Sequence, residues 1–95
     1  MKFYEFNDYS YYALIGTNTV EEALEEYRDK VADIEVDEVD LKPNILTEEK
    51  ARKRYCECLM AQGEEDKIYE YFEKEFNRII KGKQTYVFLV DYSLI

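Results

Sequence analysis

The sequence predicts a small single α+β domain, with elements in the order ββαβααβ, a sheet of three or four strands and helices mainly on one face. Three observations support this fold class. Two aromatic runs separated by turn residues open the chain, three later segments repeat their apolar residues with a helical period, and an uncharged run follows near the end. The 95 residues leave room for one domain, residues 1–95.

The first element is a predicted β-hairpin. Residues 2–6 read KFYEF and residues 11–16 read YYALIG, and both runs are rich in the aromatic and aliphatic side chains that strands favour. Asn7, Asp8 and Ser10 lie between them, as turn residues do.

A helix is predicted from Thr19 onward. Thr19 is followed three residues later by Glu22, the spacing of a capping box in which each side chain satisfies a free backbone N–H. Apolar residues recur at i, i+4, i+7 and i+11 and predict the inner face: Val20, Leu24, Tyr27 and Val31. Acidic residues occupy the opposite face: Glu21, Glu22, Glu25, Glu26 and Asp29.

The segment ADIEVD, residues 32–37, alternates non-acidic and acidic side chains and predicts a strand. Ala32, Ile34 and Val36 would then face a core, and the three acids between them would face water. Strand, helix and strand in this order favour a right-handed βαβ crossover. Pro43 ends the segment, because proline cannot continue a strand ladder.

Two more helices are predicted in the second half of the chain. Thr47 is the expected N-cap of the first, and Gly63 is placed to end it. Its expected inner face comprises Ala51, Tyr55, Cys58 and Leu59. The second is expected from about Glu65 to Lys81, and Gly82 ends it. Its broad apolar face comprises Ile68, Tyr71, Phe72, Phe76, Ile79 and Ile80.

The run TYVFLV, residues 85–90, carries no charge. Such a run predicts a central strand covered on both sides, or a strand with one wet face that binds something.

The residue types present argue against an enzyme, and we expect neither catalytic residues nor a cofactor. The chain has no histidine, which is the commonest general base and a frequent metal ligand. Its serines, Ser10 and Ser93, lie in no nucleophile motif, and Gly16 stands alone without a phosphate-cradling loop.

Cys56 and Cys58 are two residues apart on a predicted helix, where their side chains point away from each other and are poorly placed to form a disulfide. We expect one core thiol, Cys58, and one surface thiol, with no metal site. A metal-dependent regulator built on Cys56 and Cys58 is the third functional alternative, with carboxylates or a second chain completing the ligands.

The net charge of −9 is concentrated in one segment. Residues 21–40 hold ten acids and two bases, so their net charge is −8. The other 75 residues are together nearly neutral. A polyanionic surface disfavours nucleic acid and anionic membrane as direct ligands and favours a basic protein surface as the partner. Five tyrosines exceed what so small a core can hold and add to a protein-binding surface: Tyr9, Tyr11, Tyr12, Tyr69 and Tyr92.

The spacing of the acids also matches a nucleic-acid backbone. Alternate residues of a strand lie about 6.6–6.8 Å apart, and successive phosphates of one DNA strand lie roughly 6–7 Å apart. Helix acids at i and i+4 lie about 6 Å apart along the axis. The expected partner-binding residues are therefore Glu22, Glu26, Asp29, Asp33, Glu35 and Asp37.

On the run EEALEEYRDKVADIEVDEVD (21–40) and the aromatic content, the chain resembles the small acidic anti-CRISPR proteins of phages and mobile elements. The resemblance implies a DNA mimic that inhibits by occupying the basic nucleic-acid-binding surface of a CRISPR effector nuclease or another DNA-binding protein. The alternative is a generic interaction module of a mobile element that forms a homodimer through an exposed edge strand or tyrosine patch.

The expected location is the cytoplasm of a bacterial host cell. The N-terminal residues MKFYEFNDYS contain no apolar signal segment, and no apolar run approaches the ~20 residues of a membrane span. Cysteines that are poorly placed to form a disulfide are typical of proteins in a reducing compartment.

Overall fold

The computed structural model describes residues 1–61 and 68–90. Within them the elements are β1 (Lys2–Glu5), β2 (Ala13–Thr17), α1 (Val20–Lys30), the 3₁₀ turn η1 (Val36–Glu38), β3 (Asn44–Leu46), α2 (Glu48–Ala61), α3 (Tyr69–Lys81) and β4 (Tyr86–Val90).

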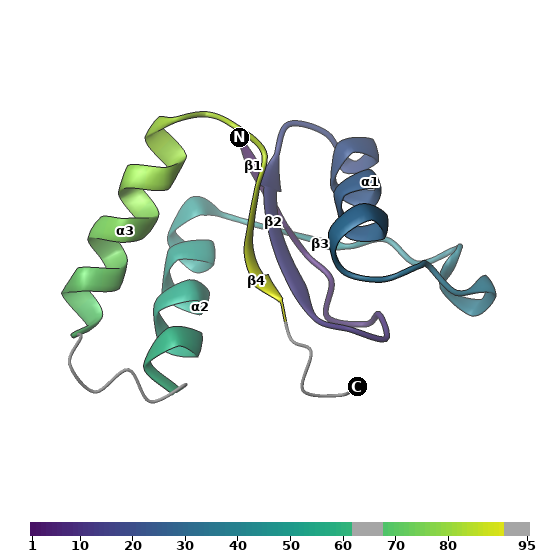
Figure 1. Ribbon diagram of the computed structural model, residues 1–95, viewed down its shortest axis with the longest axis horizontal. Coiled ribbons are helices and arrows are strands. Elements are labelled where there is room, and N and C mark those ends of the chain that lie inside the picture. The colour runs from purple at the N-terminus through teal and green to yellow at the C-terminus, as the bar shows by residue number, and fades with distance from the viewer. Residues whose placement is uncertain (62–67, 91–95) are drawn as a thin grey trace.

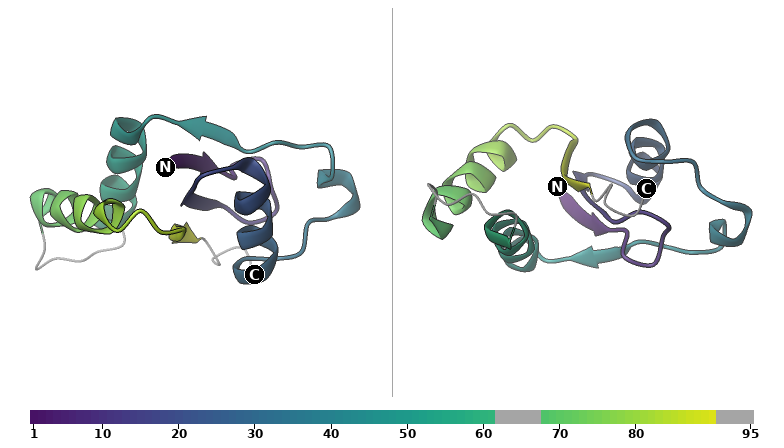
Figure 2. Two further views of the ribbon diagram at one scale, coloured as in Figure 1. Left: turned by 90° about the horizontal axis from the view of Figure 1, so that it is seen from above. Right: turned by 60° about the horizontal axis from the view of Figure 1, so that its bottom comes forward.

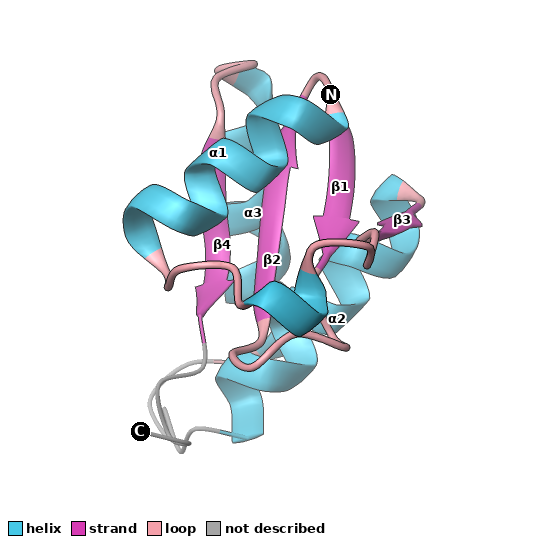
Figure 3. Cartoon of the chain, turned by 90° about the vertical axis from the view of Figure 1, so that its right-hand side faces the viewer, coloured by secondary structure: helices cyan, strands magenta, loops and turns pink. Residues whose placement is uncertain are grey.

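The four strands form one antiparallel sheet in the order β3-β1-β2-β4. Figure 1 shows α2 and α3 on one face of this sheet and α1 on the other. In Figure 3, α1 crosses the strands diagonally, and the loop that follows it passes in front of their lower ends. The predicted α+β class, element order and strand number are confirmed, with two of the three helices sharing a face.

The larger core lies between the sheet and the helix pair. Phe3 of β1, Phe76 of α3 and Phe88 of β4 meet there, with ring centroids 4.8 to 6.0 Å apart. Gly16 leaves room for this cluster, because a Cβ at that position would lie 2.7 Å from the Phe88 ring. The buried residues of this core are Phe3, Leu14, Ala51, Tyr55, Cys56, Phe72, Phe76, Phe88 and Leu89.

The second core lies between the sheet and α1. Phe6 stacks on Tyr27 with centroids 4.7 Å apart, and Tyr9 packs edge-on against Phe6. Its buried residues are Tyr4, Phe6, Tyr9, Ala13, Ile15, Ala23 and Tyr27. The predicted inner residues Val20, Leu24 and Val31 pack against this core. The helical periodicity therefore identified the buried face of α1.

The final strand is an edge strand, so the prediction of a central strand was wrong. β4 pairs with β2, and its register shifts between Leu14 and Ile15 of that strand. The shift leaves Phe88 as an extra residue, so that Phe88 and Leu89 both enter the larger core. Val87 packs against the α1 core on the other face, so the apolar run contacts both cores although β4 lies at the edge of the sheet.

The strand predicted at residues 32–37 does not form. The chain passes through coil into η1, and Val36, which was expected in a core, is 91% exposed. Ala32 and Ile34 pack against the α1 core. The alternation of apolar and acidic residues therefore reflects this packing and does not require a strand. The βαβ crossover is absent as well, because the third strand is β3, which pairs antiparallel with β1 directly after Pro43.

Most predicted helix ends are confirmed. The Thr19 hydroxyl accepts from the Glu22 amide, the Thr47 hydroxyl accepts from the Lys50 amide, and Gly82 is the C-cap of α3. The Glu22 carboxylate instead accepts from the hydroxyls of Thr17 and Thr19, so the capping box is half formed. Gly63, Tyr92 and the expected start of α3 at Glu65 lie outside the described residues.

The prediction of a surface thiol was wrong for Cys56, whereas Cys58 packs against the larger core as an inner-face residue. Cys56 is fully buried in the larger core, and Cys58 is partly buried at its margin. Both sit on α2, and neither forms a disulfide. Among the described helices, none is both long enough and apolar enough to span a bilayer.

Candidate protein-binding surface

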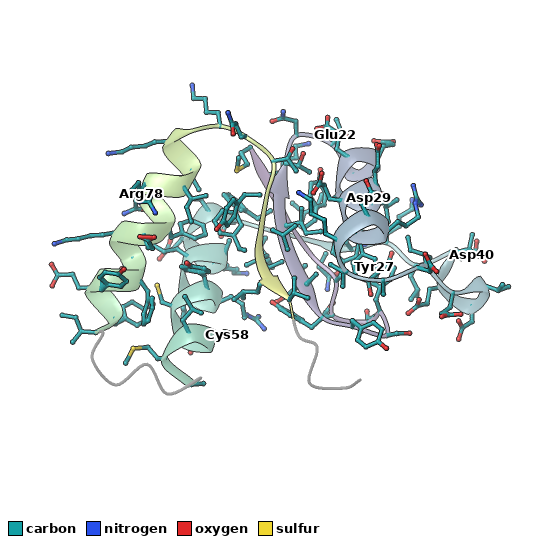
Figure 4. All side chains as sticks on the ribbon, viewed as in Figure 1. Glu22, Tyr27, Asp29, Asp40, Cys58 and Arg78 are labelled. Carbon is teal, nitrogen blue, oxygen red and sulfur yellow. The ribbon has the colours of Figure 1, made fainter. Side chains whose placement is uncertain are left out.

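Residues 21–40 form one end of the molecule, which we call the acidic end. Figures 1 and 2 show α1 and the loop after it on the side of the sheet opposite α2 and α3, with η1 at the far extremity. Figure 4 places Asp29 and Asp40 on this side and Arg78 of α3 on the other. Charges that are neighbours in sequence are therefore also neighbours in space.

The six predicted partner-binding residues do not all project freely. Glu22 turns toward the sheet, and its Oε2 accepts from the Thr17 hydroxyl at 3.0 Å. Glu26 is half-buried and pairs with Lys30 at 3.0 Å. The other four are exposed and carry their charge at the surface: Asp29, Asp33, Glu35 and Asp37.

The predicted ladder of acids along a strand does not exist, because residues 33–37 are not a strand. Asp33 and Glu35 lie in coil, and Asp37 lies in η1. The spacing of a phosphate backbone is therefore not reproduced along this segment. On α1 the i, i+4 spacing of about 6 Å remains for Glu21 and Glu25, which are both exposed.

Glu38 is the residue that sequence reasoning missed. It is 6% exposed, although its nine acidic neighbours in residues 21–40 are exposed or half-buried. Its Oε2 accepts from both the backbone N–H and the hydroxyl of Ser10, and its Oε1 accepts from the Glu35 amide at 2.9 Å. Burial alone would raise the pKa of Glu38, but these hydrogen bonds outweigh it and hold the pKa below its ordinary value.

Two tyrosines complete the attachment of this loop. The Tyr9 hydroxyl donates to the Leu41 carbonyl at 2.9 Å. The Tyr27 hydroxyl donates to the Tyr11 carbonyl at 2.9 Å and accepts from the Tyr11 amide. The hairpin turn is therefore bonded both to α1 and to the loop after it, and the acidic end is held as one unit.

The tip of the loop mixes charge with exposed apolar surface. Val36 and Val39 are 91% and 68% exposed, and each is followed directly by an exposed aspartate, Asp37 or Asp40. A surface that served solubility alone would carry polar groups at these positions. Exposed aliphatic groups beside charges are typical of a protein-binding surface.

The rest of the chain after the acidic end is neutral overall. Residues 41–95 hold ten bases and ten acids. Tyr71 of α3 and Tyr86 of β4 are 43% and 44% exposed there. Of the tyrosines expected at the surface, Tyr69 is exposed, Tyr11 and Tyr12 are half-buried, and Tyr9 is buried. The exposed tyrosines therefore do not belong to the acidic end.

Within the described part of the chain, the cysteines belong to no group of side chains that could hold a metal ion. Within residues 1–61 and 68–90, no three cysteine, aspartate or glutamate side chains gather in an arrangement that could hold a metal ion. Burial, followed by the charge of Glu73, raises the pKa of the Cys56 thiol, which lowers its reactivity.

Comparison with known proteins identifies a family. No curated protein and no solved structure matches this chain. The family model of the YosH C-terminal domain matches residues 1–89, which is nearly the whole sequence. The chain therefore belongs to the YosH C-terminal domain family.

Proposed function

We propose that this domain is a non-enzymatic inhibitor that binds, through its acidic end, the basic nucleic-acid-binding surface of a nuclease or another DNA-binding protein. The CRISPR effector nucleases are one class of partner with such a surface. A bacterial host cytoplasm is the compartment in which this domain would meet such a partner.

The observation that carries the proposal is that Glu38 is buried and hydrogen-bonded while the acids around it are exposed. One acid is buried to fasten the loop to Ser10, and exposed acids then surround the exposed Val36 and Val39. A fixed loop loses little conformational entropy when it binds, and its exposed valines supply apolar contact. The surrounding acids supply long-range attraction to a basic partner and speed the encounter.

The structure changes the form that mimicry would take. With no strand at residues 33–37, the acidic end resembles a nucleic acid through its charge density and not through a regular ladder. The exposed acids come instead from two adjoining segments, α1 and the loop that follows it: Glu21, Glu22, Glu25, Asp29, Asp33, Glu35, Asp37 and Asp40.

Reversing three of these charges tests the surface. We expect the triple variant Asp33→Lys, Glu35→Lys, Asp37→Lys to bind its partner at least about tenfold more weakly. The matched control is Glu49→Lys, Glu57→Lys, Glu70→Lys, which makes the same change in net charge on exposed positions of α2 and α3. Pull-down from bacterial lysate, followed by titration of the purified partner, measures both.

Salt provides the second part of this test. Raising ionic strength from 0.1 M to 1 M shortens the Debye length from about 10 Å to about 3 Å, so wild-type binding should weaken strongly. Equal binding by the triple variant and the control would show that the acidic end is not the binding surface.

A homodimer through β4 is the second candidate function, and one observation favours it. β4 has an edge without a strand partner among the described residues, carries no charged side chain, and exposes Tyr86. Such an edge can pair with a second chain. Light scattering distinguishes this candidate, because a dimer formed through an apolar edge should persist at high salt, whereas acidic-end binding should not.

A further inference from the structure

A hollow of about 360 Å³ lies along α2, away from the acidic end, and we call it the α2 hollow. It is lined by Lys50, Lys53, Arg54 and Glu57. The three bases follow the i, i+3, i+4 spacing, so the helix brings them to one side. A group of three cations in a chain of net charge −9 requires a physical explanation.

The guanidinium group of Arg54 forms an ion pair with a buried carboxylate. Glu5 of β1 is 3% exposed, and its Oε2 lies 3.1 Å from Nη1 of Arg54. The same oxygen accepts from the Tyr12 hydroxyl at 2.6 Å. Burial, and then this hydrogen bond, raise the pKa of Tyr12, so its hydroxyl stays protonated and donates to Glu5.

This arrangement fixes the orientation of the guanidinium group. A guanidinium has five N–H donors, and the ion pair with Glu5 is formed at one of its nitrogens, Nη1. The Arg54 side chain remains 49% exposed, and Arg54 lines the hollow. Its remaining donors are therefore available to a ligand without the entropy cost of ordering a free arginine.

We propose that the α2 hollow binds the phosphate group of a small ligand. Arginine presents a planar pair of donors that matches phosphate oxygens, and two flanking lysines add point charges. With Glu5 and Glu57 counted, the five charged groups of the hollow and its support sum to +1. This balance suits one small anion and not a polyanion, which the acidic end would repel.

This site is independent of the proposed inhibitor function. It uses α2 and β1, whereas the acidic end uses α1 and the loop after it. Loss of phosphate binding would leave the partner-binding proposal standing, and loss of partner binding would leave the α2 hollow unaffected.

Amide chemical shifts recorded during a titration with sodium phosphate at constant ionic strength test the site. We expect saturable shifts centred on residues 50–57, with a dissociation constant of roughly 1 mM. Sodium chloride serves as the blank. A nucleoside 5′-monophosphate and a short single-stranded DNA serve as further probes and distinguish free phosphate, a small phosphate ester and a polyanion.

Two variants connect the shifts to the named residues. Lys50→Gln with Lys53→Gln should weaken binding at least about tenfold, and Arg54→Lys should weaken it while keeping a cation beside Glu5. Lys74→Gln with Lys81→Gln, on exposed positions of α3, makes the same change in charge and should bind as the wild type does.

Saturation with phosphate or with the nucleotide supports the proposal if the Lys50/Lys53 and Arg54 variants weaken it and the Lys74/Lys81 control does not. Shifts that do not saturate, that chloride reproduces, or that both lysine pairs affect equally would overturn it. Tighter binding of the DNA than of either small probe would also overturn it, because the ligand would then be a polyanion.

Discussion

Phe76→Ala should destabilise the domain by about 3–5 kcal/mol, because the substitution empties the centre of the larger core. Phe76 is fully buried on α3, and its ring centroid lies 4.8 Å from that of Phe88 and 5.6 Å from that of Phe3. Arg52 lies over the same ring at 5.6 Å. Removal of the ring leaves a cavity where β1, β4, α2 and α3 meet.

Thermal and urea denaturation measure this loss. A domain of this size has a total stability of about 5–15 kcal/mol, so the variant should melt at least roughly 12 °C lower, or fail to fold. Tyr71→Ala on the same helix is the control, because Tyr71 is 43% exposed and its loss should cost about 1 kcal/mol or less. Similar losses for the two variants would contradict the assignment of the core.

Glu38→Ala is expected to cost about 2–4 kcal/mol, although Glu38 lies in an acidic segment where loss of a negative charge should otherwise help. Its carboxylate satisfies the amides of Ser10 and Glu35 and the hydroxyl of Ser10. Hydrogen exchange at these two amides should accelerate in the variant. Asp37→Ala next to it removes an exposed charge and should leave both stability and exchange nearly unchanged.

The Glu38 contribution should also depend on pH. Because the folded pKa of Glu38 lies below its ordinary value of 4.5, this contribution is complete above that pH and is lost as pH falls through the folded pKa. The difference in unfolding free energy between wild type and Glu38→Ala should therefore be constant near neutrality and shrink below about pH 4.5. A difference that stayed constant down to about pH 2 would show that the carboxylate is not responsible.

The regular helices and the hairpin could be predicted because local signals determine them. Thr19, Thr47 and Gly82 mark helix ends through backbone hydrogen bonds that involve near neighbours in the chain. β3 could not be found in this way. It is three residues long, starts directly after Pro43, and exists because β1 offers it an edge.

The acidic end was located correctly as a charged segment, and its helix was predicted, but the conformation of residues 32–37 was predicted wrongly. Alternation in ADIEVD predicted a strand, whereas the hydrogen bonds between Glu38 and Ser10, 28 residues apart in sequence, accompany a turn at residues 36–38. A long-range contact of one side chain leaves no periodic signal. The clue available in the sequence was Glu38 itself, an acid that interrupts the alternation after Asp37.

Competition between this domain and duplex DNA for the captured partner tests the central claim most directly. If the acidic end occupies a nucleic-acid-binding surface, duplex DNA should displace the domain, and the domain should displace DNA. In each direction, the concentration needed for half displacement should rise with the concentration of the other ligand. The Asp33, Glu35, Asp37 triple reversal should lose this competition, and the Glu49, Glu57, Glu70 control should keep it. A partner that binds the domain and DNA at the same time, each with unchanged affinity, would contradict the account.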